Sequence, residues 1–183
     1  MSTALNAAPA ADNQTLDALL SSIAQGNMDS LEQLYRIAAT PVHSFALSIL
    51  RNRYDAEDVL HDCFLSIARS AASYRSNGKP MAWILTIARN LSLSRLRESG
   101  RESSLDDENA VEFEAPPQGV DSEEKLLLET CLNRLSEEER QIITLHVTAG
   151  FKHREIAKLL EMPLSTVLSK YNRAIKKLRT MIS

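Results

Sequence analysis

The stretch FKHREIAKLLEMPLSTVLSKYNRAIKKLR, residues 151–179, contains two amphipathic segments separated by Met162 and Pro163. Proline interrupts a helix, so the first segment, residues 155–161, is predicted to end at this pair. In the second segment apolar residues recur at steps of four, three and four, which places them on one side of a helix. These residues are Val167, Tyr171, Ala174 and Leu178. The pattern predicts a helix-turn-helix.

The opposite side of the second helix is polar and basic. It carries hydroxyl, amide and cationic side chains together with one leucine: Ser165, Leu168, Ser169, Asn172, Arg173 and Lys176. Residues 162–183 include no acidic residue. A helix that packs on one face and offers such groups on the other fits the major groove of DNA. The alternative is a solvated basic face at the end of a helical bundle, since cations favour helix C-termini.

The whole chain has the composition of an all-α protein. Among 183 residues there are five glycines and six prolines, and strand-like runs of Val, Ile and aromatic residues are missing. Leu, Ile and Ala recur instead at steps of three and four. Because this length allows one large domain or two small ones, we predict an all-α fold of two small helical domains.

The distribution of charge places the boundary between these domains. The net charge is −3, but residues 1–101 carry +1, residues 102–125 carry −8 and residues 126–183 carry +4. The acidic stretch also contains two adjacent prolines and a glycine without any sustained period, which predicts a flexible linker. The predicted organisation is a disordered tail (1–12), a four-helix domain (13–101), an acidic linker (102–122) and a helix-turn-helix domain (123–183).

Three local signals predict where helices start. Asp55 is predicted to be the N-cap of the third helix, and Pro80 to open the fourth at a position where proline is tolerated. In the C-terminal domain, Ser136 and Glu139 have the spacing of a capping box. The helix that follows them is predicted to end near Gly150.

Nothing in the sequence indicates an enzyme, a metal site or a cofactor. Cys63 and Cys131 are predicted to be buried thiols of a reduced cytosolic protein. The N-terminus has no targeting pattern and no apolar run approaches membrane-spanning length, so no membrane insertion is expected. A hydrolase is disfavoured because the histidines lack metal-ligand spacing with a carboxylate. They are His43, His61, His146 and His153.

Three stretches of the chain carry a resemblance to a known family. The first is DAEDVLHDCFL at residues 55–65, and the second is WILTIARN at residues 83–90, followed by Arg95 and Arg97. The third combines LSEEER at 135–140, EIA at 155–157 and STVLSK at 165–170. In this order and separation they resemble the extracytoplasmic-function (ECF) sigma factors, a two-domain group of bacterial transcription initiation factors. The resemblance covers about residues 14–100 and 123–181, and implies a sigma region 2 domain followed by a sigma region 4 domain.

The resemblance implies that the third helix docks on the clamp coiled coil of core RNA polymerase. The docking residues are expected to be Asp55, Glu57, Asp58, His61 and Asp62.

The family reads the minus-ten promoter element as an unpaired strand, which requires amide or hydroxyl groups for a flipped base and cations for its phosphates. We expect the loop at residues 73–79 and the start of the fourth helix to build this pocket, with Asn90 at its floor. The minus-ten residues are expected to be Asn77, Lys79, Arg89, Asn90, Arg95 and Arg97.

The helix-turn-helix is implied to read the duplex minus-thirty-five element. Leu168 stands where the family has a cation, and an apolar side chain there can touch a thymine methyl group. Residues 152–154 begin the first helix of the pair, where phosphate contacts would orient the domain. The minus-thirty-five residues are expected to be Lys152, His153, Arg154, Ser165, Thr166, Leu168, Ser169, Lys170, Asn172, Arg173 and Lys176.

The resemblance therefore implies an ECF-type sigma factor that binds core RNA polymerase, directs it to promoters and helps melt the minus-ten element in the bacterial cytoplasm. Its expected partners are core RNA polymerase (clamp coiled coil and flap), promoter DNA in duplex and single-stranded form, and an anti-sigma factor. The alternative is a helix-turn-helix transcriptional regulator that acts without polymerase docking. The acidic third helix and the Asn/Arg-rich fourth helix favour the sigma factor, because such a regulator needs neither.

Overall fold

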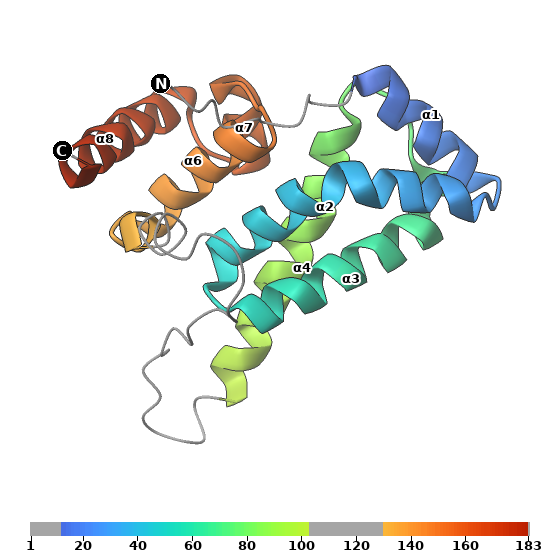
Figure 1. Cartoon of the computed structure of the whole chain (residues 1–183), viewed down its shortest axis with the longest axis horizontal. Helices are drawn as coiled ribbons and strands as arrows, with labels where there is room; N and C mark the ends of the chain where they lie inside the picture. The colour runs from blue at the N-terminus through green and yellow to red at the C-terminus, as the bar shows by residue number, and fades with distance from the viewer. Residues whose placement is uncertain (1–11, 103–129, 183) are drawn as a thin grey trace.

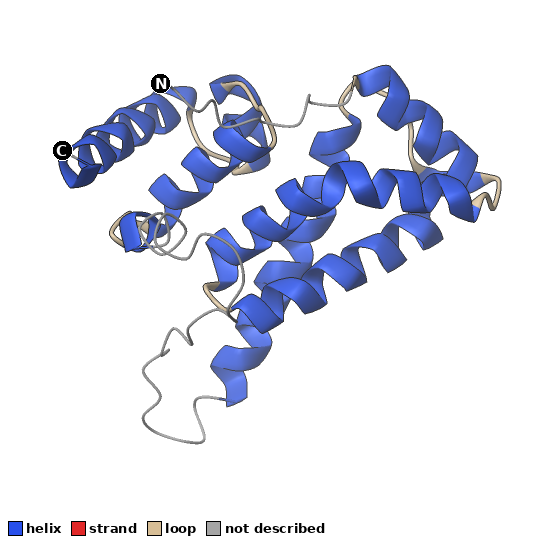
Figure 2. Cartoon of the chain, viewed as in Figure 1, coloured by secondary structure: helices blue, strands red, loops and turns tan. Residues whose placement is uncertain are grey.

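The computed structural model describes residues 12–102 and 130–182, which form helices joined by short loops (Figures 1 and 2). No strand occurs in these two ranges, and the predicted all-α class is confirmed. Almost all of the predicted tail and of the predicted linker lies outside the described residues. None of the helices in the two ranges is long and apolar enough to cross a membrane.

The N-terminal group of helices is built around α2, which packs against α1, α3 and α4. Its core consists of apolar side chains at helical spacing, among which Leu34, Phe45, Ile67 and Ile84 are fully buried. Burying each such side chain contributes about 1.5–3 kcal/mol relative to leaving it exposed. The elements are α1 (Asn13–Ala24), α2 (Met28–Leu50), α3 (Arg53–Ser70), the short 3-10 helix η1 (Ala71–Ser73) and α4 (Pro80–Glu102).

The start of α3 differs from the prediction. Asn52, in an extended conformation, is the N-cap, and its side chain accepts a 3.0 Å hydrogen bond from the backbone N–H of Asp55. Asp55 therefore lies inside the first turn and is not the cap. The chain turns earlier because Arg51 adopts a left-handed conformation with φ 57°, which ends α2 directly before Asn52. Pro80 opens α4 as predicted.

The C-terminal group begins, within the described residues, with a helical segment at 130–133. It continues with α6 (Glu137–Thr148), α7 (His153–Leu159) and α8 (Leu164–Ile182). The predicted capping box is present: the Ser136 hydroxyl accepts from the N–H of Glu139, whose carboxylate accepts from the N–H of Ser136. Gly150, with φ 68°, follows the end of α6, also as predicted.

The corner between α7 and α8 is closed by two backbone hydrogen bonds. The N–H of Met162 donates to the carbonyl of Ala157 at 2.9 Å, and the N–H of Glu161 donates to that of Lys158 at 3.3 Å. Together they form a Schellman motif, which needs a left-handed residue after the helix; Glu161 supplies it with φ 57°. The motif ends α7 at Leu159, two residues before the predicted end, and α8 starts directly after Pro163.

The two groups of helices pack directly against each other, with α6 on α2. One hydrophobic cluster contains side chains of both groups, among them Phe45, Ile142 and Leu145. At the junction Arg140 is buried, and its Nε donates a 2.9 Å hydrogen bond to the carbonyl oxygen of Ser48. Ser48 lies in the last turn of α2, where carbonyl groups lack helical partners and attract cations. The largest hydrophobic cluster of the described residues therefore spans both groups.

Both cysteines are buried and free. Burial raises the pKa of the Cys63 thiol to about 12, so it stays protonated at neutral pH. Cys63 therefore acts as a small apolar side chain of the core.

Candidate nucleic-acid interface

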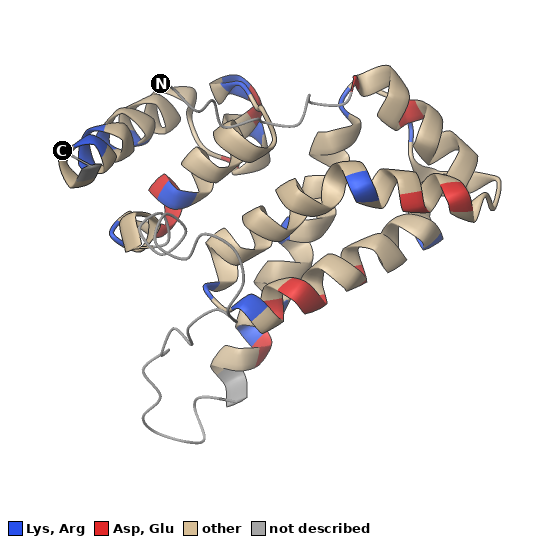
Figure 3. Ribbon diagram, in the orientation of Figure 1, with Lys and Arg blue, Asp and Glu red and all other residues tan. Residues whose placement is uncertain are grey.

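Charged side chains are unevenly distributed over the helices: basic residues follow α8, and acidic residues gather near the start of α3 (Figure 3). The buried face of α8 is the predicted one, because Val167 and Ala174 have no exposed surface. On the opposite face the Arg173 guanidinium donates a 3.2 Å hydrogen bond to the Ser169 hydroxyl. The residues predicted to point outward are all exposed: Ser165, Leu168, Ser169, Asn172, Arg173 and Lys176.

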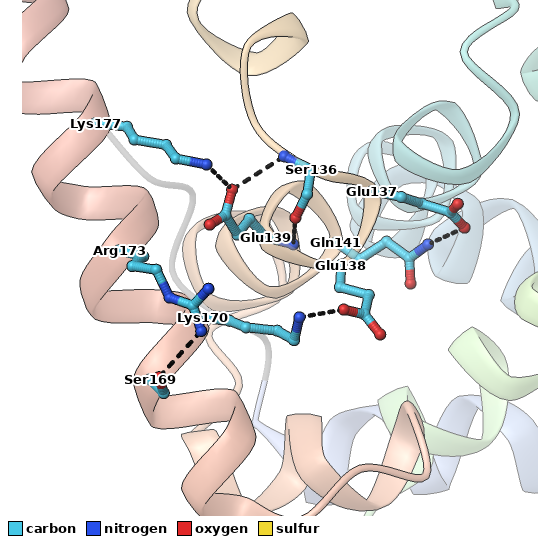
Figure 4. A network of polar contacts seen from close by, with 9 residues as sticks. All are labelled: Ser136, Glu137, Glu138, Glu139, Gln141, Ser169, Lys170, Arg173 and Lys177. Carbon is cyan, nitrogen blue, oxygen red and sulfur yellow. Dashed lines mark hydrogen bonds and ion pairs between the residues drawn. The ribbon is translucent and has the colours of Figure 1, made fainter.

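Two lysines of α8 instead face α6 (Figure 4). Lys170 forms an ion pair with Glu138, and Lys177 with Glu139 at 2.7 Å. Lys170 was predicted to contact the minus-thirty-five element, but it lies at the edge of the apolar stripe, next to Val167 and Tyr171, and its side chain is only 21% exposed. The structure therefore assigns Lys170 to the contact between the two helices. Thr166 is likewise half-buried.

Glu139 holds α6 and α8 together from a buried position. Burial alone would raise the pKa of its carboxyl group, but hydrogen bonds from Lys177 and from the backbone N–H of Ser136 outweigh burial and lower the pKa. The carboxylate therefore stays ionised at neutral pH. It fixes α8, and with it the outward face, relative to the start of α6.

The first helix of the pair presents two of its three predicted phosphate contacts. Lys152 and Arg154 are exposed, but the His153 ring stacks on His146 at 5.1 Å and meets the Tyr171 ring edge-on at 4.5 Å. Its Nε2 is buried and has no hydrogen-bond partner. The predicted phosphate contact of His153 is therefore not available in this structure, because the ring packs between α6 and α8.

The His153 stack makes the stability of the protein depend on pH. Burial, and then the neighbouring His146, lower the pKa of His153 below its ordinary value of 6.5. The unfolded chain thus takes up a proton near pH 6.5 that the folded chain resists. We expect the free energy of unfolding to be highest above pH 6.5 and to fall as the pH decreases through this value, measured by urea unfolding at pH 5 to 8.

Two variants test this assignment. His153→Phe keeps an aromatic ring in the stack and removes the titrating imidazole, whose Nε2 has no hydrogen-bond partner in the wild type. The free energy of unfolding of this variant should therefore vary less with pH. His61→Gln, at an exposed site, should keep the wild-type pH dependence. An unchanged pH dependence in His153→Phe would contradict the assignment.

The outward face of α4 carries the predicted minus-ten residues Asn90 and Arg97. Thr86, which is not among the predicted residues, lies four residues before Asn90 and is also exposed, so these three side chains share one face. The signal for Thr86 was its spacing from Asn90 in the helical period. Arg95 points elsewhere: it pairs with Asp55 at 3.1 Å and with Asp58. This correction arises because α4 crosses the start of α3.

The loop before α4 and Asn90 are not parts of one base pocket. Asn77 and Lys79 are exposed beside the start of α4, while Asn90 lies ten residues beyond Pro80, which is about 15 Å along the helix. The predicted residues therefore extend along α4. They form one extended surface, with the loop at one end.

Two cations of this surface contact the C-terminal group. The Lys79 Nζ lies 3.7 Å from the Glu155 carboxylate, and the Arg89 guanidinium lies 3.6 Å from that of Glu161. Both acids belong to α7 or to the corner that follows it. The helix-turn-helix thus covers part of the predicted minus-ten surface in this conformation.

The exposed face of α3 carries the predicted docking residues Asp58, His61 and Asp62. The other two are less exposed: Asp55 contacts Arg95, and Glu57 pairs with Arg53 at 3.0 Å. Two apolar side chains occupy the same face, Tyr54 at 66% and Leu65 at 53% exposure. Asp58 and Leu65 follow Tyr54 by four and eleven residues, so the three side chains lie on one side of the helix. The face therefore combines acids with exposed apolar groups.

Comparisons with known proteins match both halves of the chain. The family model for Sigma-70 region 2 matches residues 34–102, and the model for Sigma-70, region 4 matches residues 125–178. The chain is 28% identical over 181 residues to the ECF RNA polymerase sigma factor SigK of Mycobacterium ulcerans (strain Agy99), covering 95% of this chain and 97% of that protein. It is 27% identical over 174 residues to SigK of Mycobacterium sp. (strain KMS), covering 91% and 90%.

Two solved structures have a similar fold. The sigma factor RpoE in complex with the anti-sigma factor NepR from Bartonella quintana has a TM-score of 0.72 and 26% identity, covering 82% of this chain and 95% of that chain. CnrH in complex with the cytosolic domain of CnrY has a TM-score of 0.63 and 21% identity, covering 92% and 97%. The second likeness concerns the fold alone.

Proposed function

The chain belongs to the ECF sigma factors, with regions 2 and 4 of the sigma-70 family, and we propose that it binds core RNA polymerase, directs it to specific promoters and helps melt the minus-ten element. The observation that carries the proposal is the presence of three separate exposed faces on one chain, on α3, α4 and α8. A helix-turn-helix regulator acting alone needs only the face on α8. The comparisons support the sigma factor and not this alternative.

The face on α3 is the proposed docking site for polymerase. Asp58 and Asp62 supply negative charge, and Tyr54 and Leu65 supply apolar surface that water would leave on docking. Apolar burial supplies affinity, while charge complementarity sets orientation and association rate. The clamp coiled coil is the proposed partner of this face.

The faces on α4 and α8 are proposed to bind different forms of DNA. On α4, the hydroxyl of Thr86, the amide of Asn90 and the guanidinium of Arg97 offer contacts to the bases and phosphates of an unpaired strand. On α8, the proposed base contacts come from Asn172 and Arg173. Asparagine and arginine are residue types that make bidentate contacts with adenine and guanine, respectively, in the major groove. Melting would follow because the α4 face binds only bases that have left the duplex.

Binding of both promoter elements would require the two groups of helices to separate. The elements are named for positions 25 base pairs apart, which is about 85 Å of duplex. In the described structure α6 lies on α2, and Lys79 and Arg89 are paired with acids of the C-terminal group. These ion pairs are partly solvent-exposed and, at 3.7 and 3.6 Å, long, and therefore weak, so a polymerase surface that holds the two regions apart can replace them.

We expect the free chain to bind duplex promoter DNA weakly and to bind it specifically once core RNA polymerase is added. The reason is that two weak DNA-binding faces gain combined affinity only when core RNA polymerase fixes the distance between them. Electrophoretic mobility shifts with and without core polymerase on a genomic promoter library, followed by in vitro transcription, measure this. Tight, sequence-specific binding by the free chain, with no change on adding polymerase, would instead favour the independent regulator.

The remaining partners follow from the same proposal. A sigma factor at 26% identity is solved with an anti-sigma factor, which supports an anti-sigma factor as a partner of this chain. Catalysis would belong to the polymerase, so no catalytic residue is assigned. Because bacterial RNA polymerase works in the cytoplasm, the proposal places the protein there.

A further inference from the structure

The loop between η1 and α4, residues 74–79, is hydrogen-bonded to α1 at alternate positions. The side chain or carbonyl of every second residue, 74, 76 and 78, is bound by α1. Arg75, Asn77 and Lys79 are exposed, as are Ser76 and Gly78, whose bonds to α1 lie at the surface. Of the first three, Asn77 and Lys79 belong to the predicted minus-ten surface.

Asp17 of α1 binds the loop through both of its carboxylate oxygens. Its Oδ1 accepts a 2.5 Å hydrogen bond from the Tyr74 hydroxyl, and its Oδ2 accepts a 2.7 Å bond from the Ser76 hydroxyl. Asn13, one helical turn earlier, donates from its Nδ2 to the carbonyl oxygen of Gly78 at 2.9 Å. Hydrogen bonds from hydroxyl groups to a carboxylate are among the strong ones, so these contacts restrict the loop.

Tyr74 links this anchor to α4. Its ring lies 4.9 Å from that of Trp83, which packs against the core of the N-terminal group. Burial, and then the hydrogen bond to Asp17, raise the pKa of the Tyr74 hydroxyl to about 12, so it remains a donor across the neutral range. The loop is thus fixed at α1 by polar contacts and at α4 by a ring contact.

We propose that Asp17, assisted by Asn13, is a positioning residue for recognition of the unpaired minus-ten strand, and that Arg75 contacts a phosphate of that strand beside Asn77 and Lys79. The proposal rests on the proposed function of the chain. Anchoring residues 74, 76 and 78 fixes the backbone that carries Arg75, Asn77 and Lys79. Without the anchor, this exposed loop would have to be ordered by the DNA itself, at a cost in affinity and base discrimination.

The test uses holoenzyme assembled from core RNA polymerase and the full chain. Asp17→Leu removes the acceptor. Tyr74→Phe removes one donor but keeps the ring on Trp83, and Ser76→Ala removes the other donor, on an exposed side chain. Asp29→Asn, an exposed acid of α2, is the matched control for loss of charge. Binding is measured on duplex promoter and on premelted templates in which each base of the minus-ten strand is varied.

We expect assembly with core polymerase and duplex binding to stay at wild-type levels in all four variants. Asp17→Leu and Tyr74→Phe should each bind the premelted template about 10-fold more weakly, with reduced discrimination among bases, and Ser76→Ala should lose less. The double variant of Asp17 and Tyr74 should lose little more than Asp17→Leu, because Asp17→Leu already removes the bond from Tyr74. Arg75→Gln should weaken binding equally for every base and reduce its salt dependence.

The outcomes separate this proposal from the proposed function. If wild-type holoenzyme fails to bind premelted template, the proposed function is wrong. If wild type binds and Asp17→Leu, Tyr74→Phe and Ser76→Ala all behave like Asp29→Asn, the positioning role is overturned while the proposed function stands. Should Asp17→Leu fail to assemble, Tyr74→Phe and Ser76→Ala decide by the same criterion.

Discussion

We expect replacement of Asp58 and Asp62 by lysine to abolish binding to core RNA polymerase while the chain still folds. Both side chains are exposed on α3, and the double substitution turns two negative charges into two positive ones at the centre of the proposed docking face. Like charges across an interface cost several kcal/mol, so affinity should fall roughly 100-fold or more. Fluorescence anisotropy with labelled chain and core polymerase measures it.

The fold should survive because the lost contacts are at the surface. Asp58 pairs with Arg95, but such an exposed pair contributes about 1 kcal/mol or less. Asp62→Lys alone leaves the pair of Asp58 and Arg95 intact and should already weaken binding to polymerase. This single variant therefore shows whether the loss of binding comes from the docking face or from the release of Arg95. The matched control replaces Asp29 and Glu32 of α2 by lysine, with the same change in charge. Wild-type binding by a folded double variant of Asp58 and Asp62 would remove the docking assignment.

The second large effect separates the two DNA-binding faces. Arg173→Ala should weaken binding of holoenzyme to duplex promoter by about 1–3 kcal/mol, or roughly 5- to 150-fold, if the guanidinium makes a bidentate base contact. Asn90→Ala should leave this closed complex unchanged and impair formation of the open complex. A premelted template should restore binding of the Asn90 variant but not its discrimination among bases. Permanganate footprinting on duplex and bubble templates measures both.

Lys170 provides the control on the recognition helix. It has the same charge and lies three residues before Arg173, but it is paired with Glu138 against α6. Lys170→Ala should therefore change duplex binding less than Arg173→Ala does. If the two substitutions weaken binding equally, base contact at Arg173 is not the cause. If Asn90→Ala melts the promoter normally and keeps its base preference, Asn90 does not bind the flipped base.

The sequence predicted the faces of individual helices well. In α8 the apolar period placed Val167 and Ala174 inside and Arg173 outside, and the structure agrees, because an amphipathic helix has only one apolar stripe to bury. The capping box at Ser136 was equally predictable, since its two hydrogen bonds join residues three positions apart.

The contacts that the sequence did not predict concern side chains whose partners lie elsewhere in the chain. Lys170 meets Glu138, Arg95 meets Asp55, and His153 stacks on His146 only once the helices have packed. No local period records such contacts. The anchor at Asp17 was missed for the same reason, because its partners are 57 and 59 residues away. Sequence patterns thus identify which face of a helix is exposed, but not which exposed charges are already paired.

If the two groups of helices separate on polymerase, as proposed, the contact of α6 with α2, closed by Arg140 and Ser48, sets a conformational equilibrium. A partner that binds only the separated form finds its apparent affinity reduced by the fraction of molecules that are separated. With about one molecule in 100 separated, that affinity would be about 100-fold lower than the intrinsic one. A ligand that prefers the packed form would lower the apparent affinity of such a partner. It would do so without covering the exposed faces on α3, α4 or α8. The strength of this one junction therefore sets how sensitively the chain responds to competition between its partners.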